Sequence, residues 1–124
     1  MMQIQAIHHV SLPVADLDRS RQFYEGVLGL LPDPARPAMA FDGVWYALGA
    51  ASIHLLCLPD SCPPAQETVS GGRDRHVAFA VDDIAALGER LRQAGFDFSP
   101  SSSGRAALFC RDPDGHALEF LAVR

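Results

Sequence analysis

The chain opens on a segment in which apolar and polar residues alternate. Residues 4–14 follow a two-residue period, which is typical of a strand with one buried face. The apolar face carries Val10, Leu12 and Val14, whereas the other face carries His9 and Ser11. We therefore expect a strand whose histidine and serine point away from the core.

A helix is predicted directly after this strand. Asp16 is a residue type that caps helix N-termini, and the apolar residues beyond it keep helical spacing as far as Leu28. Gly29 supplies the C-terminal stop. A Pro-rich connection then leads to two strand candidates, about 39–48 and 51–58.

The same order of elements restarts after a loop at residues 59–75, which is rich in Pro, Gly and Ser. Residues 76–81 form the next predicted strand, and Asp83 caps a helix that ends at Gly95. A polar link follows at about 99–104. The chain closes with a hairpin around a strong turn signal, Asp112-Pro113-Asp114-Gly115, with expected strands at 106–111 and 117–123.

Two histidines stand at the head of near-identical stretches in these halves. His9-Val-Ser-Leu-Pro-Val-Ala-Asp is echoed, 67 residues later, by His76-Val-Ala-Phe-Ala-Val-Asp-Asp. This register selects His9 rather than His8. The last strands of the halves also align, with His54 opposite Glu119. We therefore expect a single α+β domain over residues 1–124, built from two βαβββ modules at about 4–58 and 76–124.

The repeated positions carry side chains that can bind metal. Two imidazoles and one carboxylate suit a divalent transition metal with open coordination positions. The strand face of His76 also carries Ala78 and Ala80, which leave room beside the histidine. From the residues alone the alternative stays open that these are structural strand histidines and an exposed glutamate. His116 follows Gly115 in the turn, and we expect its side chain to be solvated.

Composition narrows the class of protein. Apolar residues make up 48% of the chain and charged residues 20%, as in ordinary globular domains. The net charge is −5 and the arginines are scattered, so a nucleic-acid partner is not expected. The three cysteines indicate neither a disulfide framework nor a zinc knuckle. With no signal-peptide pattern and no apolar run of membrane length, we expect a cytoplasmic protein without a membrane partner.

Four stretches together match one known superfamily. They are residues 9–24, 27–30, 75–79 and 112–120. Through them the chain resembles the vicinal oxygen chelate superfamily, which includes glyoxalase I, fosfomycin-resistance thiol transferases, extradiol dioxygenases and bleomycin-binding proteins. The resemblance implies paired modules whose curved sheets enclose a cavity, and a homodimer in which both subunits complete the site.

The resemblance also implies which residues form the site. A divalent metal ion (Ni, Zn, Mn or Fe) would be bound by His9, His76 and Glu119. His54 stands where glyoxalase I has a glutamate, so it is a candidate for a fourth ligand or for a substrate contact. Ser11 and Arg105 are candidates for binding substrate.

Three functions follow as hypotheses. The first is a metal-dependent glyoxalase-like enzyme, of the lyase/isomerase or thiol transferase type, acting on a small oxygen-rich substrate chelated through two oxygens. The second is an extradiol-type Fe(II) dioxygenase, which would use the same three ligands. The third is a metal-free protein that binds an antibiotic, as bleomycin-resistance proteins do.

Overall fold

The structure is a computed structural model that describes residues 1–61, 69, 71–100 and 106–123. The first half contains β1 (His9–Val14), α1 (Leu17–Arg21), the π-helical turns η1 (Gln22–Val27), β2 (Gly43–Leu48), β3 (Ala51–Cys57) and a 3-10 turn, η2 (Pro59–Ser61). The second half contains β4 (His76–Val81), α2 (Ile84–Gln93), β5 (Phe98–Pro100), β6 (Ala107–Arg111) and β7 (Ala117–Ala122).

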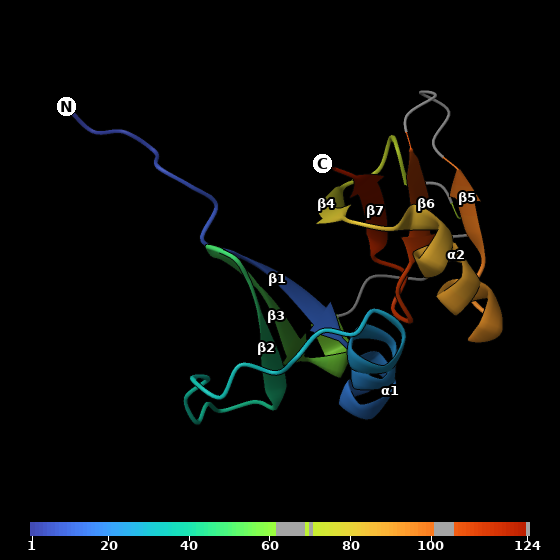
Figure 1. The fold of residues 1–124 in the computed structure, drawn as a ribbon. Helices are drawn as coiled ribbons and strands as arrows, with labels where there is room; N and C mark the ends of the chain where they lie inside the picture. Colours follow the sequence, from blue (N-terminus) through green and yellow to red (C-terminus); the bar gives the residue numbers. More distant parts are fainter. Residues whose placement is uncertain (62–68, 70, 101–105, 124) are drawn as a thin grey trace.

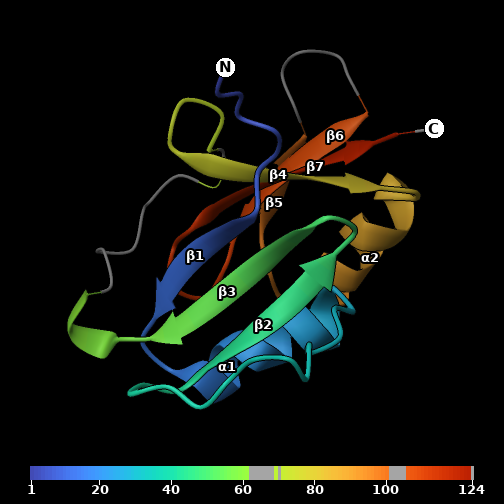
Figure 2. The same cartoon turned by 90° about the vertical axis from the view of Figure 1, so that its left-hand side faces the viewer.

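Each half folds into its own mixed sheet, as Figures 1 and 2 show. The first sheet has the strand order β1-β3-β2 and the second has the order β4-β7-β6-β5. The outer strands β1 and β4 run parallel to β3 and β7, and the remaining pairs are antiparallel. This arrangement confirms the predicted α+β class and the correspondence between the two halves.

The halves differ in the strand that the sequence places after the first helix. In the second half β5 pairs with β6, but in the first half only an isolated bridge joins Pro32 to Tyr46. The reason is the Pro-rich connection, because proline has no N–H to donate to a sheet ladder. The first module therefore has three paired strands instead of the four expected.

The strand predicted for residues 4–14 begins only at His9. Its pairing with β3 starts at His9 opposite Ser52, and residues 1–8 extend away from the body of the molecule (Figure 1). The predicted faces are confirmed, since Leu12 and Val14 are buried and His9 and Ser11 are exposed. Local alternation gives a segment the capacity to form a strand, but the ladder ends where the partner strand ends.

One apolar core joins the two halves. The π-helical turns η1 contribute Phe23 and Tyr24, which are fully buried, and α2 contributes Leu91. The ring of Phe23 lies 4.8 Å from that of Phe96, so η1 packs on the segment that follows α2. Each helix ends at a glycine with positive φ, as predicted, with Gly29 at +77° and Gly95 at +82°. Within the described part of the chain, no helix has the length and apolarity needed to cross a membrane.

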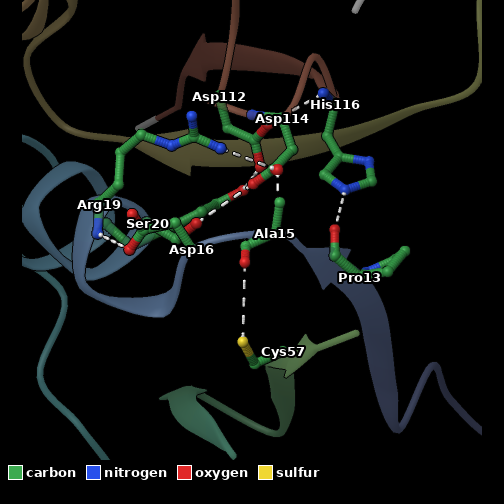
Figure 3. A network of polar contacts seen from close by, with 10 residues as sticks. Pro13, Ala15, Asp16, Arg19, Ser20, Cys57, Asp112, Asp114 and His116 are labelled. Atoms are coloured by element: carbon green, nitrogen blue, oxygen red, sulfur yellow. Dashed lines mark hydrogen bonds and ion pairs between the residues drawn. The ribbon is translucent and has the colours of Figure 1, made fainter. Parts of the chain in front are cut away.

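The turn before β7 binds the first half through polar contacts, drawn in Figure 3. The carboxylate of Asp114 accepts hydrogen bonds from the backbone N–H of Ala15 at 3.0 Å, from Arg19 at 3.1 Å and from the Ser20 hydroxyl at 3.2 Å. His116 Nε2 donates to the carbonyl of Pro13 at 2.7 Å. The expectation of a solvated His116 is therefore wrong, because its ring bridges the two halves.

Candidate functional site

The second sheet brings two of the predicted ligands together. His76 begins β4, and Glu119 lies on the neighbouring strand β7, opposite Ala78. His76 Nε2 is 3.0 Å from Glu119 Oε1. The glutamate side chain is only 6% exposed and the histidine 24%, so the pair lies at the edge of the protein interior with the imidazole on its outer side.

The other nitrogen of His76 is held by the backbone. His76 Nδ1 donates to the carbonyl of Asp74 at 2.8 Å. Such an outer partner fixes the tautomer and orientation of a ligating histidine. With the Nδ1 proton committed to Asp74, Nε2 meets Glu119 either through a second proton, as an ion pair, or through a shared cation. This donor arrangement fits half of a metal site.

The segment that supplies this carbonyl is itself fixed at two points. Arg111 Nη1 lies 3.1 Å from Asp74 Oδ2, and its hydrogen bond lowers the pKa of that carboxyl. Gly71 is buried against β7, where an added Cβ would lie 2.3 Å from the Cβ of Ala117. Only glycine allows so close an approach, so the segment 71–75 follows the surface of the sheet.

The first sheet presents the matching pair, His9 and His54, but in a different contact. Their rings are stacked, with centres 4.2 Å apart and planes at 11°. His8, the neighbour that the register of the repeat does not select, is exposed and contacts His9, since their Nδ1 atoms are 2.8 Å apart. Burial lowers the pKa of His54, and the nearby His9 and His8 lower it further, because a second positive charge is disfavoured there.

A residue absent from the sequence prediction completes this group. Trp45 of β2 stacks on the other face of His54, with centres 4.1 Å apart and planes at 6°. Its counterpart is Phe109 of β6, since Trp45 pairs with His54 and Phe109 with Glu119. The sequence offset between His54 and Glu119 would align Trp45 with Cys110, so the match with Phe109 follows from the pairing of the hairpin strands and not from the repeat.

The structure does not gather all the predicted ligands in one chain. Among the described residues, no three His, Cys, Asp or Glu side chains lie close enough to hold a metal ion. His9 and His54 lie on the first sheet, whereas His76 and Glu119 lie on the second. Three-residue binding of one ion by His9, His76 and Glu119 therefore stays a prediction.

Two cavities lie between the edge strands β1 and β4. One, of about 510 Å³, is lined by Ser11, Pro13, His76 and His116 among others, so the predicted Ser11 and His76 face the same cavity. The second, of about 740 Å³, is more apolar and is lined by parts of β1, β3 and β4. Arg105, the other candidate for substrate binding, falls outside the described residues.

Comparison with known families gives a match over most of the chain. The family model described as the Glyoxalase/Bleomycin resistance protein/Dioxygenase superfamily matches residues 6–120. A lactoylglutathione lyase from Haemophilus influenzae is 34% identical, covering 93% of this chain and 90% of that protein. A glutathione transferase FosA from Serratia marcescens is 30% identical, covering 94% and 79%.

Solved structures show the same fold. A protein of Bacillus anthracis placed in the glyoxalase family superposes with a TM-score of 0.78 at 24% identity, covering 100% of this chain and 99% of that one. TnmS3, an antibiotic binding protein from Streptomyces sp. CB03234, superposes with a TM-score of 0.75 at 21% identity over the whole of both chains. At these identities the likeness establishes the architecture alone.

Proposed function

Because the chain belongs to the glyoxalase/bleomycin resistance protein/dioxygenase superfamily, we propose that it is a metal-dependent enzyme of the lyase/isomerase or thiol transferase type. Its substrate would be a small oxygen-rich molecule chelated through two oxygens. The observation that carries the proposal is the His76–Glu119 pair, 3.0 Å apart, with His76 Nδ1 bound to the Asp74 carbonyl. Two donors are thereby fixed on rigid strands with their outer partner already in place.

Relatives support the choice of reaction class. Curated relatives at 30% identity or more carry two names, lactoylglutathione lyase and glutathione transferase. Both names describe chemistry on a glutathione compound. A thiol adduct of an oxygen-rich molecule is accordingly the first substrate class to test on this chain.

A bound divalent ion would polarise a substrate carbonyl or stabilise an enolate. The protein's own part is to hold that ion and to align the substrate. His76 presents Nε2 because Nδ1 is committed to Asp74, and Glu119 supplies a carboxylate that is largely shielded from water. Ser11, in the same cavity as His76, offers a hydroxyl to a substrate oxygen.

The third ligand, His9, would come from a second copy of the chain. Each half of one chain presents two matched positions, and the halves do not unite them within the described residues. The edges of β1 and β4 that face away from β3 and β7 carry no strand pairing in the described part of the chain. A homodimer that places the first half of one copy against the second half of the other would bring the three ligands together.

The second candidate is a metal-free protein that binds an antibiotic. It is favoured by the same His76–Glu119 contact read as an ion pair, since 3.0 Å is an ordinary charge-assisted hydrogen bond. The likeness to an antibiotic-binding fold is compatible with this role. The extradiol dioxygenase hypothesis shares the ligand set of the enzyme and differs in requiring iron.

Metal analysis separates these candidates. Protein purified without chelator or affinity-tag metal is titrated with Ni²⁺, Zn²⁺, Mn²⁺ and Fe²⁺ by calorimetry, with His76→Ala as the variant and Asp82→Ala, an exposed position, as the control. We expect one ion per chain in the wild type and at least a 100-fold weaker affinity in His76→Ala. Metal content below about 0.1 ion per chain, with no binding on titration, would favour the metal-free candidate. Formation of lactoylglutathione by the metal-loaded protein then tests the lyase reaction.

A further inference from the structure

Three aromatic rings form one stack on the first sheet. His54 of β3 lies between Trp45 of β2 and His9 of β1, with ring centres 4.1 and 4.2 Å away. Trp45 and His54 are register partners on antiparallel strands, so the backbone fixes their contact. His54 is thus held ring against ring on both sides.

This geometry bears on whether His54 can bind the same ion as His9. The lone pair of an imidazole nitrogen lies in the ring plane, so a bound ion lies in that plane at about 2 Å from the nitrogen. Rings whose centres are 4.2 Å apart with planes at 11° must lie face over face, because side by side their atoms would overlap. An ion in the plane of His9 is therefore out of the plane of His54.

In the second half, Glu119 occupies the position that matches His54. Glu119 reaches its histidine through a hydrogen bond of 3.0 Å, and the paired aromatic ring, Phe109, meets His76 edge-on at 5.6 Å and 78°. In the first half the equivalent position stacks instead of pointing a donor at its histidine. The equivalent positions therefore supply a ligand in one half and a ring in the other.

We propose that His54 is an aromatic spacer rather than a metal ligand, and that Trp45 is the positioning residue that holds it. The stack fixes the ring plane of His9. His8 Nδ1 lies 2.8 Å from His9 Nδ1, and in the tautomer in which His9 donates there, its Nε2 would be left to the ion. An ion held by His9, His76 and Glu119 would then have three protein ligands, and His54 would not compete with substrate oxygens for it. This inference rests on the proposed function and assigns His54 and Trp45 their roles within that site.

The test compares Co²⁺ binding to the full-length protein and its variants by calorimetry and by the visible absorption of bound cobalt. His54→Phe keeps a ring in the stack and removes both nitrogens. We expect its affinity to stay within about threefold of the wild type, with the same cobalt spectrum, whereas His9→Ala should lose at least 100-fold. Trp45→Leu should weaken binding about tenfold, the usual effect of losing an outer partner, and Trp45→Phe should restore it.

The outcomes distinguish failure of the inference from failure of the proposed function. A wild type that binds no cobalt contradicts the proposed function. A wild type that binds, with His54→Phe weakened as much as His9→Ala, shows that His54 is a ligand and overturns the inference. Wild-type affinity in Trp45→Leu overturns the role of Trp45. If His54→Phe does not fold, the imidazole ¹⁵N resonances of the Zn²⁺-titrated wild type decide, since only ligating nitrogens should show the metal-induced shift.

Discussion

Asp112 links the two halves of the molecule through its buried carboxylate. The Tyr24 hydroxyl donates to Oδ2 at 2.6 Å, and the backbone N–H groups of Asp114 and His116 donate to Oδ1 at 2.9 Å. Burial still raises the pKa of Asp112, because desolvation of the charged form outweighs these hydrogen bonds. The folded state therefore binds this proton more tightly than the unfolded state.

A Tyr24→Phe variant should show this linkage. It removes a hydrogen bond to a charged acceptor, at a cost of about 2 kcal/mol of unfolding free energy at pH 7. The raised pKa of Asp112 means that its contribution to stability is fullest below the unfolded value of 3.8 and declines as pH rises through the folded value. The deficit of Tyr24→Phe should accordingly be smaller at pH 4 than at pH 7. Urea denaturation at both pH values measures it, and an equal deficit would contradict the assignment.

The sequence identifies the turn at residues 112–115 but not the contacts that its side chains make. Asp112-Pro113-Asp114-Gly115 predicts a turn because of its local chemistry, and Gly115 indeed has φ of +88°. The bonds from Asp114 to Arg19 and from His116 to Pro13 join residues far apart in the chain. Such contacts depend on how the halves pack, which no local pattern expresses.

The helices α1 and α2 both begin with an aspartate N-cap. Asp16 accepts from the N–H of Arg19 at 3.1 Å, and Asp83 accepts from that of Ala86 at 2.9 Å. Both caps are predicted from the sequence, since each aspartate follows a strand at the matched position of its half. Capping is a local interaction, and for that reason the residues alone reveal it.

An Asp83→Ala variant should lose this cap. The expected cost is about 1 kcal/mol of unfolding free energy, the usual effect of replacing an aspartate N-cap by alanine. Asp82→Ala is the matched control, because Asp82 is an exposed aspartate one position earlier and no cap of α2. Thermal unfolding followed by circular dichroism measures both. A loss in Asp82→Ala equal to that in Asp83→Ala would refute the assignment of the cap.

Strands whose bounds depend on pairing with another strand are predicted less well from the sequence. The strand at 76–81 is found at its predicted bounds, because both of its faces carry a clear pattern. The segment 4–8, included in the predicted strand, pairs with no strand in the described structure, and prolines reduce the fourth strand of the first half to one bridge. Trp45 is missed for a related reason, since its importance depends on its register with His54.

Because His9 lies on the first sheet and His76 on the second, the proposed dimer can be tested by mixing two variant chains. His9→Ala and His76→Ala chains are denatured together, refolded and titrated with metal. If each site combines the first half of one copy with the second half of the other, every mixed dimer has one site with both changes and one intact site. Random pairing should then restore about a quarter of wild-type binding. Each variant refolded alone is the control, and a mixture that binds no better than these controls would contradict a shared site.

His76 Nδ1 donates to the main-chain carbonyl of Asp74, and this affects which substitutions would disturb the orientation of the His76 ring. No side-chain substitution at Asp74 deletes that oxygen, so the histidine keeps its tautomer through changes that would disable a site oriented by a carboxylate. The position sensitive to substitution is instead Gly71, where an added Cβ would lie 2.3 Å from the Cβ of Ala117. A substitution at Gly71 is therefore expected to displace the segment that carries the Asp74 carbonyl, and with it the orientation of the His76 ring, although Gly71 lies five residues before that histidine.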